Sequence, residues 1–175
     1  MAIQQVVSEL NRIQAVGLIS AYAIGGAVAA QAYIESSSTV DVDVFVVFGG
    51  AGAHSLAPLT PIYSDLTSHG ARADGQYLVI GDWPVQLLPS VSPLYNDAIA
   101  SARTMNFGDQ PGRIMGPEHL AAIALATGRD KDYARVEQFL KSGATDLAAL
   151  TALVERFDLR ERWETFKRRY PTTNA

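Results

Sequence analysis

The chain has 175 residues, a formal net charge of −4 and no cysteine, which excludes disulfides and thiolate metal sites. It has no apolar run near the roughly 20 residues of a membrane-spanning helix. Its start, MAIQQVVSELNRIQ, lacks the basic residues and the apolar core of a signal peptide. We therefore expect a cytoplasmic protein with no membrane segment, long enough to bury one main core.

The charges are unevenly distributed along the chain. Residues 1–100 contain two basic and eight acidic side chains, whereas residues 101–175 contain twelve basic and ten acidic ones. The basic half can supply counter-charge to a phosphorylated ligand, but a helical tail with solvated Lys and Arg explains the same numbers. The final segment, LRERWETFKRRY, intersperses its basic residues with Glu161 and Glu164, which is typical of a solvated helix face.

The first half of the chain alternates helical and strand patterns. A helix begins at Ile3 and stops at Gly17, and a strand over 21–24, a helix over 27–36 and a strand over 40–48 follow it. Next come a helix over 55–69, interrupted by Pro58 and Pro61, and two strands over 76–81 and 84–89 around a turn at Gly81 and Asp82.

The second half is mainly helical. A helix over 94–102 and extended pieces over 103–107 and 112–115 precede helices over 117–128, 132–143, 145–157 and 159–170. The whole predicts an α+β fold, in which a mixed β-sheet is flanked by helices and followed by a helical C-terminal part. We expect a core over residues 1–115 and a helical region over 116–175 that packs on it as one compact unit.

Two aspartates stand at the start of the strand VDVDVFVVF. Asp41 and Asp43 are two residues apart, so their carboxylates point to the same face and repel each other unless a cation lies between them. Such a pair can bind a hard divalent cation, Mg²⁺ or Mn²⁺. Gly25 and Gly26 precede the intervening helix, where bare backbone can approach a phosphate. Each feature taken alone has a simpler explanation: the Asp pair can be two solvated acids, and the Gly-Gly pair can be an ordinary tight turn.

Together and in this order, the Gly-Gly turn, the helix and the Asp-x-Asp strand resemble the signature of the nucleotidyltransferase superfamily typified by DNA polymerase beta. The small residues after the turn and Thr39, two residues before Asp41, resemble small bacterial members of the AbiEii-toxin-like and related groups. A second stretch, PEHLAAIALATGRDKDYARVEQFL, is similar to a pattern Pro-Glu-x-Leu…Gly-Arg-x-Lys-Asp of these proteins. The two motifs cover about residues 20–142.

The resemblance implies a nucleotidyltransferase-type sheet and a division of roles among the matching residues. It assigns the metal to Asp41 and Asp43. It assigns the nucleotide to Gly25, Gly26, Thr39, Arg129 and Lys131. For Arg129 a structural alternative stays open, an i, i+3 pair with Asp132 at a helix start.

The chain departs from the pattern where members carry a third carboxylate on a later strand. The matching stretch, PVQLLP, offers Gln86, whose amide can ligate a metal but cannot act as a base. Asp82 and, more remotely, Asp74 are the acids that could compensate. Two basic positions of the relatives are also replaced, by Ser37 and Ala124.

Two functions follow from these observations. The first is a metal-dependent nucleotidyltransferase that moves a nucleoside monophosphate from an NTP to a hydroxyl of RNA, protein or a small molecule, with Gln86 at the third catalytic position. The second is a catalytically degenerate module that binds a nucleotide or a protein partner. The resemblance places such a module in a toxin–antitoxin or phage-defence system.

Overall fold

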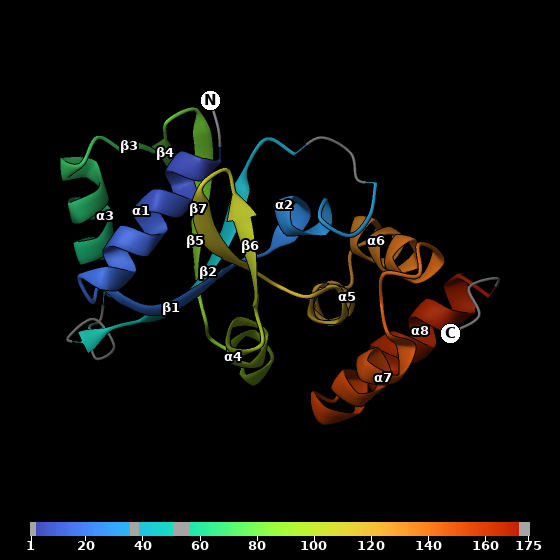
Figure 1. The fold of residues 1–175 in the computed structure, drawn as a ribbon. Helices are drawn as coiled ribbons and strands as arrows, with labels where there is room; N and C mark the ends of the chain where they lie inside the picture. Colours follow the sequence, from blue (N-terminus) through green and yellow to red (C-terminus); the bar gives the residue numbers. More distant parts are fainter. Residues whose placement is uncertain (1–2, 36–38, 51–56, 172–175) are drawn as a thin grey trace. The chain divides into compact units, whose positions relative to one another are not determined.

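The β-branched and aromatic runs of the first 115 residues form a seven-stranded mixed sheet in the computed structural model, which describes residues 3–35, 39–50 and 57–171 (Figure 1). The strands are β1 (Ile19–Ile24), β2 (Val42–Phe48), β3 (Arg72–Asp74), β4 (Tyr77–Ile80), β5 (Trp83–Pro89), β6 (Arg103–Phe107) and β7 (Gln110–Ile114). Their order is β3-β4-β5-β2-β1-β7-β6. The pairs β2–β5 and β1–β7 are parallel, and the other neighbours are antiparallel.

Eight helices complete the described part of the chain, and the predicted α+β fold is confirmed. They are α1 (Gln4–Ala15), α2 (Gly26–Ala30), α3 (Leu59–Ser68), α4 (Pro93–Ala100), α5 (Pro117–Thr127), α6 (Asp130–Lys141), α7 (Leu147–Arg156) and α8 (Arg160–Arg169). None of the described helices is long and apolar enough to cross a bilayer.

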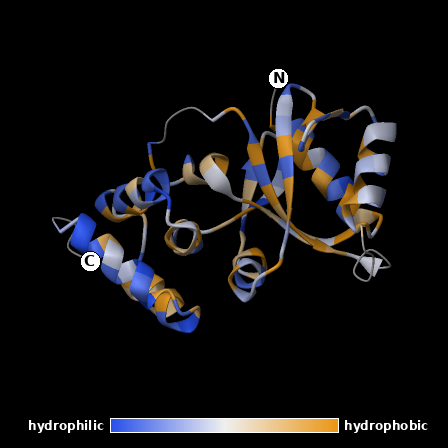
Figure 2. Cartoon of the chain, turned by 180° about the vertical axis from the view of Figure 1, so that it is seen from behind, coloured by the Kyte–Doolittle hydropathy of each residue, from blue (hydrophilic) through white to orange (hydrophobic). Residues whose placement is uncertain are grey.

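The two faces of the sheet are covered by different helices. On one face, the hydroxyl of Tyr22 donates a hydrogen bond to Asn11 of α1, and Tyr22 is in register with the buried Val46 of β2. Side chains alternate along a strand, so Phe45 lies on the opposite face, where its ring packs edge-on against Tyr95 of α4, 4.9 Å between ring centroids. Apolar residues dominate the central strands β1, β2 and β5 (Figure 2), because β2 and its neighbours are covered on both sides.

The structure corrects two expected helices and adds one strand. α2 ends at Ala30 rather than near residue 36, because the carbonyl of Ala30 accepts from the amides of Tyr33 and Ile34 in a tightened turn. α3 is not interrupted: Pro58 caps it and Pro61 lies in its first turn, where amide hydrogens have no helical partner. The short strand β3, exposed at the sheet edge, was not predicted.

The chain divides into two compact units. The first comprises Met1–Val28 and Ser37–Met115, and the second comprises Ala29–Ser36 and Gly116–Ala175. The sequence-based division into a core over 1–115 and a helical region over 116–175 stays a prediction about domains. Within the second unit the core contains a stacked pair, Trp163 and Phe166, with centroids 5.3 Å apart.

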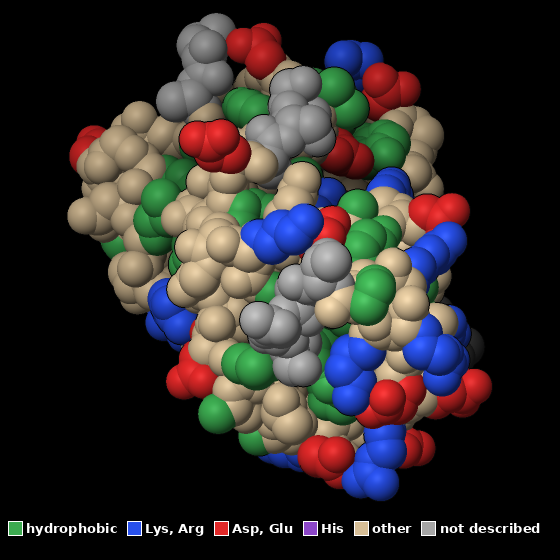
Figure 3. Space-filling model, turned by 90° about the vertical axis from the view of Figure 1, so that its right-hand side faces the viewer, with side chains coloured by type: hydrophobic (Ala, Val, Ile, Leu, Met, Phe, Trp, Pro, Cys, Tyr) green, Lys and Arg blue, Asp and Glu red, His purple; other side chains and the backbone are tan. Residues whose placement is uncertain are grey.

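The outer surface of the last helix is charged. Lys167 pairs with Glu164, and Arg160 pairs with Glu155. Figure 3 shows Lys and Arg side chains interspersed with Asp and Glu side chains on the face it presents. The described part of α8 therefore agrees with the expected solvated, mixed-charge face.

Candidate functional site

The Asp pair lies at the start of β2, in the first unit. Asp43 belongs to the strand and Asp41 immediately precedes it, and both are half-buried. Val42 between them is fully buried on the face that α1 covers. Because residues i and i+2 of an extended chain point the same way, both carboxylates belong to the opposite face of the sheet.

Gln86 is the in-register neighbour of Asp43 on the parallel strand β5. Adjacent strands lie about 4.8 Å apart and paired residues share a face, so the amide of Gln86 stands beside the carboxylate of Asp43. The structure therefore brings together the two Asp residues and the residue at the position where the resemblance implies a third acid. This proximity follows from strand register, since the residues are 43 positions apart in the sequence.

The Gly-Gly turn is packed directly against Asp43. The amide of Gly25 donates to the carbonyl oxygen of Asp43 at 2.9 Å. Gly26 has φ +57°, and a Cβ placed on it would lie 2.1 Å from Oδ2 of Asp43. Only glycine satisfies both the left-handed backbone and this close approach, so the turn is built around the carboxylate.

Two side chains hold the carboxylate of Asp41. The hydroxyl of Thr39 lies 3.1 Å from Oδ1 of Asp41 and 3.1 Å from its carbonyl oxygen. The hydroxyl of Tyr77, at the start of β4, lies 3.4 Å from Oδ2. Thr39 thus contacts Asp41, one of the two candidate metal ligands. The contact of Thr39 with a nucleotide stays a prediction. Sequence reasoning missed Tyr77, and only the order β4-β5-β2 could have indicated it.

The acids considered as substitutes lie away from the pair. Asp82 is exposed in the turn between β4 and β5, beyond the Ile80–Trp83 pair that closes the hairpin. Asp74 is on β3, three strands from β2 and hence about 14 Å away at 4.8 Å per strand. Among the described residues, no three His, Cys, Asp or Glu side chains form a group able to hold a metal.

The basic candidates belong to the second unit. The guanidinium of Arg129 makes a two-point contact with Asp132, with Nε to Oδ2 at 2.6 Å and the other contact at 3.2 Å. Asp132 is only 3% exposed, so this ion pair anchors the start of α6, as the structural alternative expected. Lys131 is exposed and has no acidic partner in the described part of the chain. Their contact with a nucleotide stays a prediction.

Ala124 and Ser37 stand at the two positions where the resembling proteins carry basic residues. Ala124 is buried inside α5 with 5% exposure, so a lysine there would have to extend out of a packed helix interface. Ser37 lies outside the described residues.

The donor set fits a magnesium ion. Asp41 and Asp43 supply carboxylate oxygens and Gln86 supplies an amide oxygen, and Mg²⁺ takes one or two protein carboxylates and completes its shell with water and substrate phosphates. The hydrogen bonds from Thr39 and Tyr77 leave lone pairs on both oxygens of Asp41. They also fix its orientation, as groups behind metal-binding carboxylates do.

The sequence comparisons find no match to a family model and no match to a curated protein. Solved structures do match. An antigenic nucleotidyltransferase-like protein from Paracoccidioides brasiliensis is 15% identical, with coverage of 93% of this chain and 92% of that one and a TM-score of 0.57. The antibiotic-resistance factor ANT(2″)-Ia in complex with adenylyl-2″-tobramycin is 16% identical, with coverage of 91% and 96% and a TM-score of 0.50.

The chain has a nucleotidyltransferase-like fold. This confirms the fold that the motifs led us to expect. The closer placement among small bacterial AbiEii-toxin-like proteins stays a prediction.

Proposed function

We propose that the protein is a nucleotidyltransferase that moves a nucleoside monophosphate from an NTP to a hydroxyl acceptor. The observation that carries the proposal is the packing of Gly26 against Asp43, with Gln86 in register beside it. Two neighbouring carboxylates repel each other, which costs stability unless a cation lies between them. A glycine turn packed against one of these carboxylates therefore favours a cation-binding site over a purely structural role. The nucleotidyltransferase-like fold supports the same conclusion.

The reaction makes one bond and breaks one. The acceptor oxygen bonds to the α-phosphorus of the NTP, the bond from that phosphorus to the bridging oxygen breaks, and pyrophosphate leaves with the bridging oxygen. The proton of the hydroxyl must be taken up by a base or by water. When bound, Mg²⁺ would neutralise charge on the phosphates and stabilise the attacking and leaving oxygens.

The residues of this chain would bind and orient the nucleotide. The amide of Gly25 is committed to the carbonyl of Asp43, so phosphate contacts fall to the first-turn amides of α2, from Gly26 onward, which have no helical acceptor. Asp41 and Asp43 would hold the cation, with Thr39 and Tyr77 keeping Asp41 in place.

Gln86 favours a second candidate function. Its amide cannot accept the hydroxyl proton, and losing general-base assistance costs about 10²–10⁴ in rate. No third acid completes the group in the described residues. A catalytically degenerate module that binds a nucleotide or a protein partner is therefore the alternative, and a toxin–antitoxin or phage-defence setting belongs to that alternative.

Calorimetric titration with each of the four NTPs, with and without Mg²⁺, tests the shared binding step. We expect Mg²⁺-dependent binding that disappears in Asp41→Ala/Asp43→Ala. The matched control is Asp74→Ala/Asp109→Ala, which removes the same charge at exposed positions and should bind normally. Equal binding by both double variants would refute the metal-site assignment. No NTP binding by the wild-type protein would refute the transferase and leave a protein-binding module.

The Gln86→Asp variant separates an active enzyme from a degenerate one. It restores an acid beside Asp43 at the register position given by β5. Transfer is measured from labelled NTP to three acceptor classes, RNA, protein and small molecules with hydroxyls; the adenylylated tobramycin in one structural neighbour makes the third class worth including. Transfer that rises with Gln86→Asp supports a weakened enzyme. Binding without transfer in both forms supports the module.

A further inference from the structure

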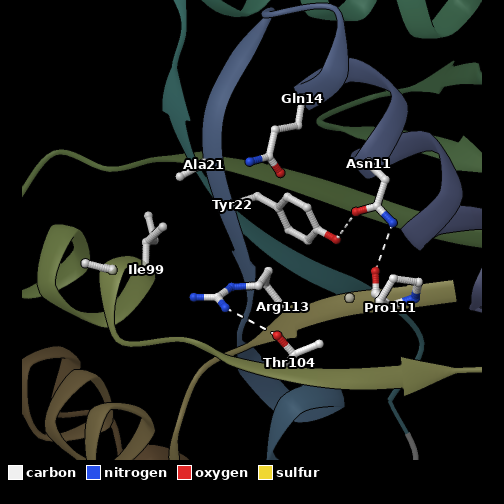
Figure 4. Close-up of a pocket in the computed structure, with 10 residues that line it drawn as sticks. Asn11, Gln14, Ala21, Tyr22, Ile99, Thr104, Pro111 and Arg113 are labelled. Carbon is white, nitrogen blue, oxygen red and sulfur yellow. Dashed lines mark hydrogen bonds between the residues drawn. The ribbon is translucent and has the colours of Figure 1, made fainter.

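A cavity of about 480 Å³ lies in the first unit, between α1, β1, α4, β6 and β7 (Figure 4). Its ten lining residues include Asn11 and Gln14 of α1, Tyr22 of β1, Ala100 of α4, Thr104 of β6 and Arg113 of β7. None of these residues belongs to the Asp pair, the Gly-Gly turn or Gln86. A volume of this size is within the range of small-molecule sites.

The cavity exists because two neighbouring strands separate. β1 and β7 are in register at Ile24 and Ile114, and no further pair joins them. Side chains of α1 bind a backbone carbonyl on each of the two strands. Nδ2 of Asn11 donates to the carbonyl of Pro111 at 2.9 Å, and Nε2 of Gln14 donates to the carbonyl of Ser20 at 3.2 Å. These hydrogen bonds connect α1 to both strands beside the opening and provide partners for the two carbonyls there.

Arg113 is the one charged residue among the ten that line the cavity. Its side chain extends between Tyr22 and Thr104 toward Ile99 (Figure 4), and it is half-buried. Its guanidinium makes one long hydrogen bond, 3.4 Å to the hydroxyl of Thr104, and its charge also acts on the phenol of Tyr22. Within the described ranges, no carboxylate forms an ion pair with it. A partly desolvated guanidinium with most of its five donors unused is matched by an oxyanion.

The remaining walls define the body of the ligand. Ala21 and Ala100 present accessible aliphatic surface to the cavity, whereas Ile99, only 3% exposed, lies behind that surface. Tyr22 is 1% exposed and its hydroxyl donates to Asn11, so it supports the floor of the cavity rather than contacting the ligand. With one cation and no second basic residue, the cavity compensates a single negative charge. A phosphate with two charges would leave one uncompensated.

We propose that this cavity binds a small organic monoanion, a carboxylate with an apolar body, which pairs with Arg113. The site is separate from the proposed nucleotide site. Arg113 binds the carboxylate through its planar fork, and the apolar body rests against the accessible side chains of Ala21 and Ala100.

Amide chemical shifts of the full chain, followed by ¹H–¹⁵N NMR, test the proposal. Acetate, isobutyrate and benzoate are titrated separately, with benzamide as the neutral counterpart of benzoate and inorganic phosphate as the dianion. We expect saturable shift changes at the amides of Tyr22, Gly112 and Arg113 with each carboxylate. The affinity should rise from acetate to benzoate, and benzamide should cause no such changes. If none of the carboxylates gives saturable shifts at these amides, or if phosphate binds as tightly as benzoate, the proposal is wrong.

Variants separate the charge from the shape of the cavity. Arg113→Gln removes the charge and should weaken benzoate by about tenfold or more, because a hydrogen bond to a charged group contributes about 1.5 kcal/mol or more. Arg103→Gln, which removes a charge from the exposed strand β6, is the matched control and should bind normally. Should Arg113→Gln fail to fold, Ala100→Leu places bulk in the cavity from an exposed helix position and must also weaken benzoate. Undiminished binding by Ala100→Leu would place the ligand elsewhere.

Discussion

The contact between Gly26 and Asp43 makes a quantitative prediction for Gly26→Ala. The new Cβ would lie 2.1 Å from Oδ2, 2.9 Å from Cγ and 3.1 Å from Cβ of Asp43, at a backbone φ of +57°. A left-handed conformation costs an alanine about 1 kcal/mol after the gain in unfolded-chain entropy is subtracted. Overpacking adds about 1–3 kcal/mol. We therefore expect a loss of about 2–4 kcal/mol in the free energy of unfolding.

A matched glycine isolates the backbone part of this cost. Gly75, in the turn between β3 and β4, has φ +60° and no atom within 4 Å of an added Cβ. Gly75→Ala should therefore lose only about 1 kcal/mol. Urea unfolding followed by circular dichroism measures both values under identical conditions.

A double-variant cycle isolates the contact itself. Asp43→Ala removes the carboxylate and leaves only the Cβ, 3.1 Å from the added methyl group. In that background Gly26→Ala should cost about 1 kcal/mol, so the coupling between the two positions is about 1–3 kcal/mol. If Gly26→Ala costs the same as Gly75→Ala in both backgrounds, the turn is not built against the carboxylate, and the central observation of the site fails.

Three further predictions concern single side chains. Tyr77→Phe removes the donor to Asp41 and should lower Mg²⁺ affinity by about tenfold, the lower end for a group behind a metal-binding carboxylate; an unchanged affinity in calorimetry would contradict the role given to Tyr77. Burial raises the pKa of the Tyr22 phenol above its ordinary value of 10.0. The folded chain therefore holds this proton more tightly than the unfolded chain, and the free energy of unfolding should fall as the pH rises above 10. Tyr22→Phe should make that decline shallower in urea unfolding, and an identical decline would rule out Tyr22 as its source. Asp146 accepts hydrogen bonds from two first-turn amides of α7, at 2.8 and 3.2 Å, so Asp146→Ala should lower the free energy of unfolding by about 1 kcal/mol, whereas Asp146→Asn, which keeps the cap, should not.

Local chemistry was readable from the sequence because each signal acts over a few residues. Gly128 ends α5 in the left-handed conformation, with φ +70°, and Pro117 lies in its first turn, both as predicted. The alternation around Asp43 gave the strand and the shared face of the Asp pair. The sequence predicted an α2 that is too long and an α3 that is interrupted. Both predictions were wrong because a single hydrogen-bonded turn decides where α2 ends and whether α3 accommodates its prolines.

The sequence by itself determined most of the helices and strands, the residue types of the site and the absence of a third acid at Gln86, because these depend on residue identity and short spacing. Only the tertiary structure decided that Gln86 stands beside Asp43, that Tyr77 reaches Asp41 and that β1 and β7 part to leave a cavity around Arg113. The reason is physical: strand order and register arise from pairing between residues far apart in the chain, and no local pattern specifies which strands become neighbours.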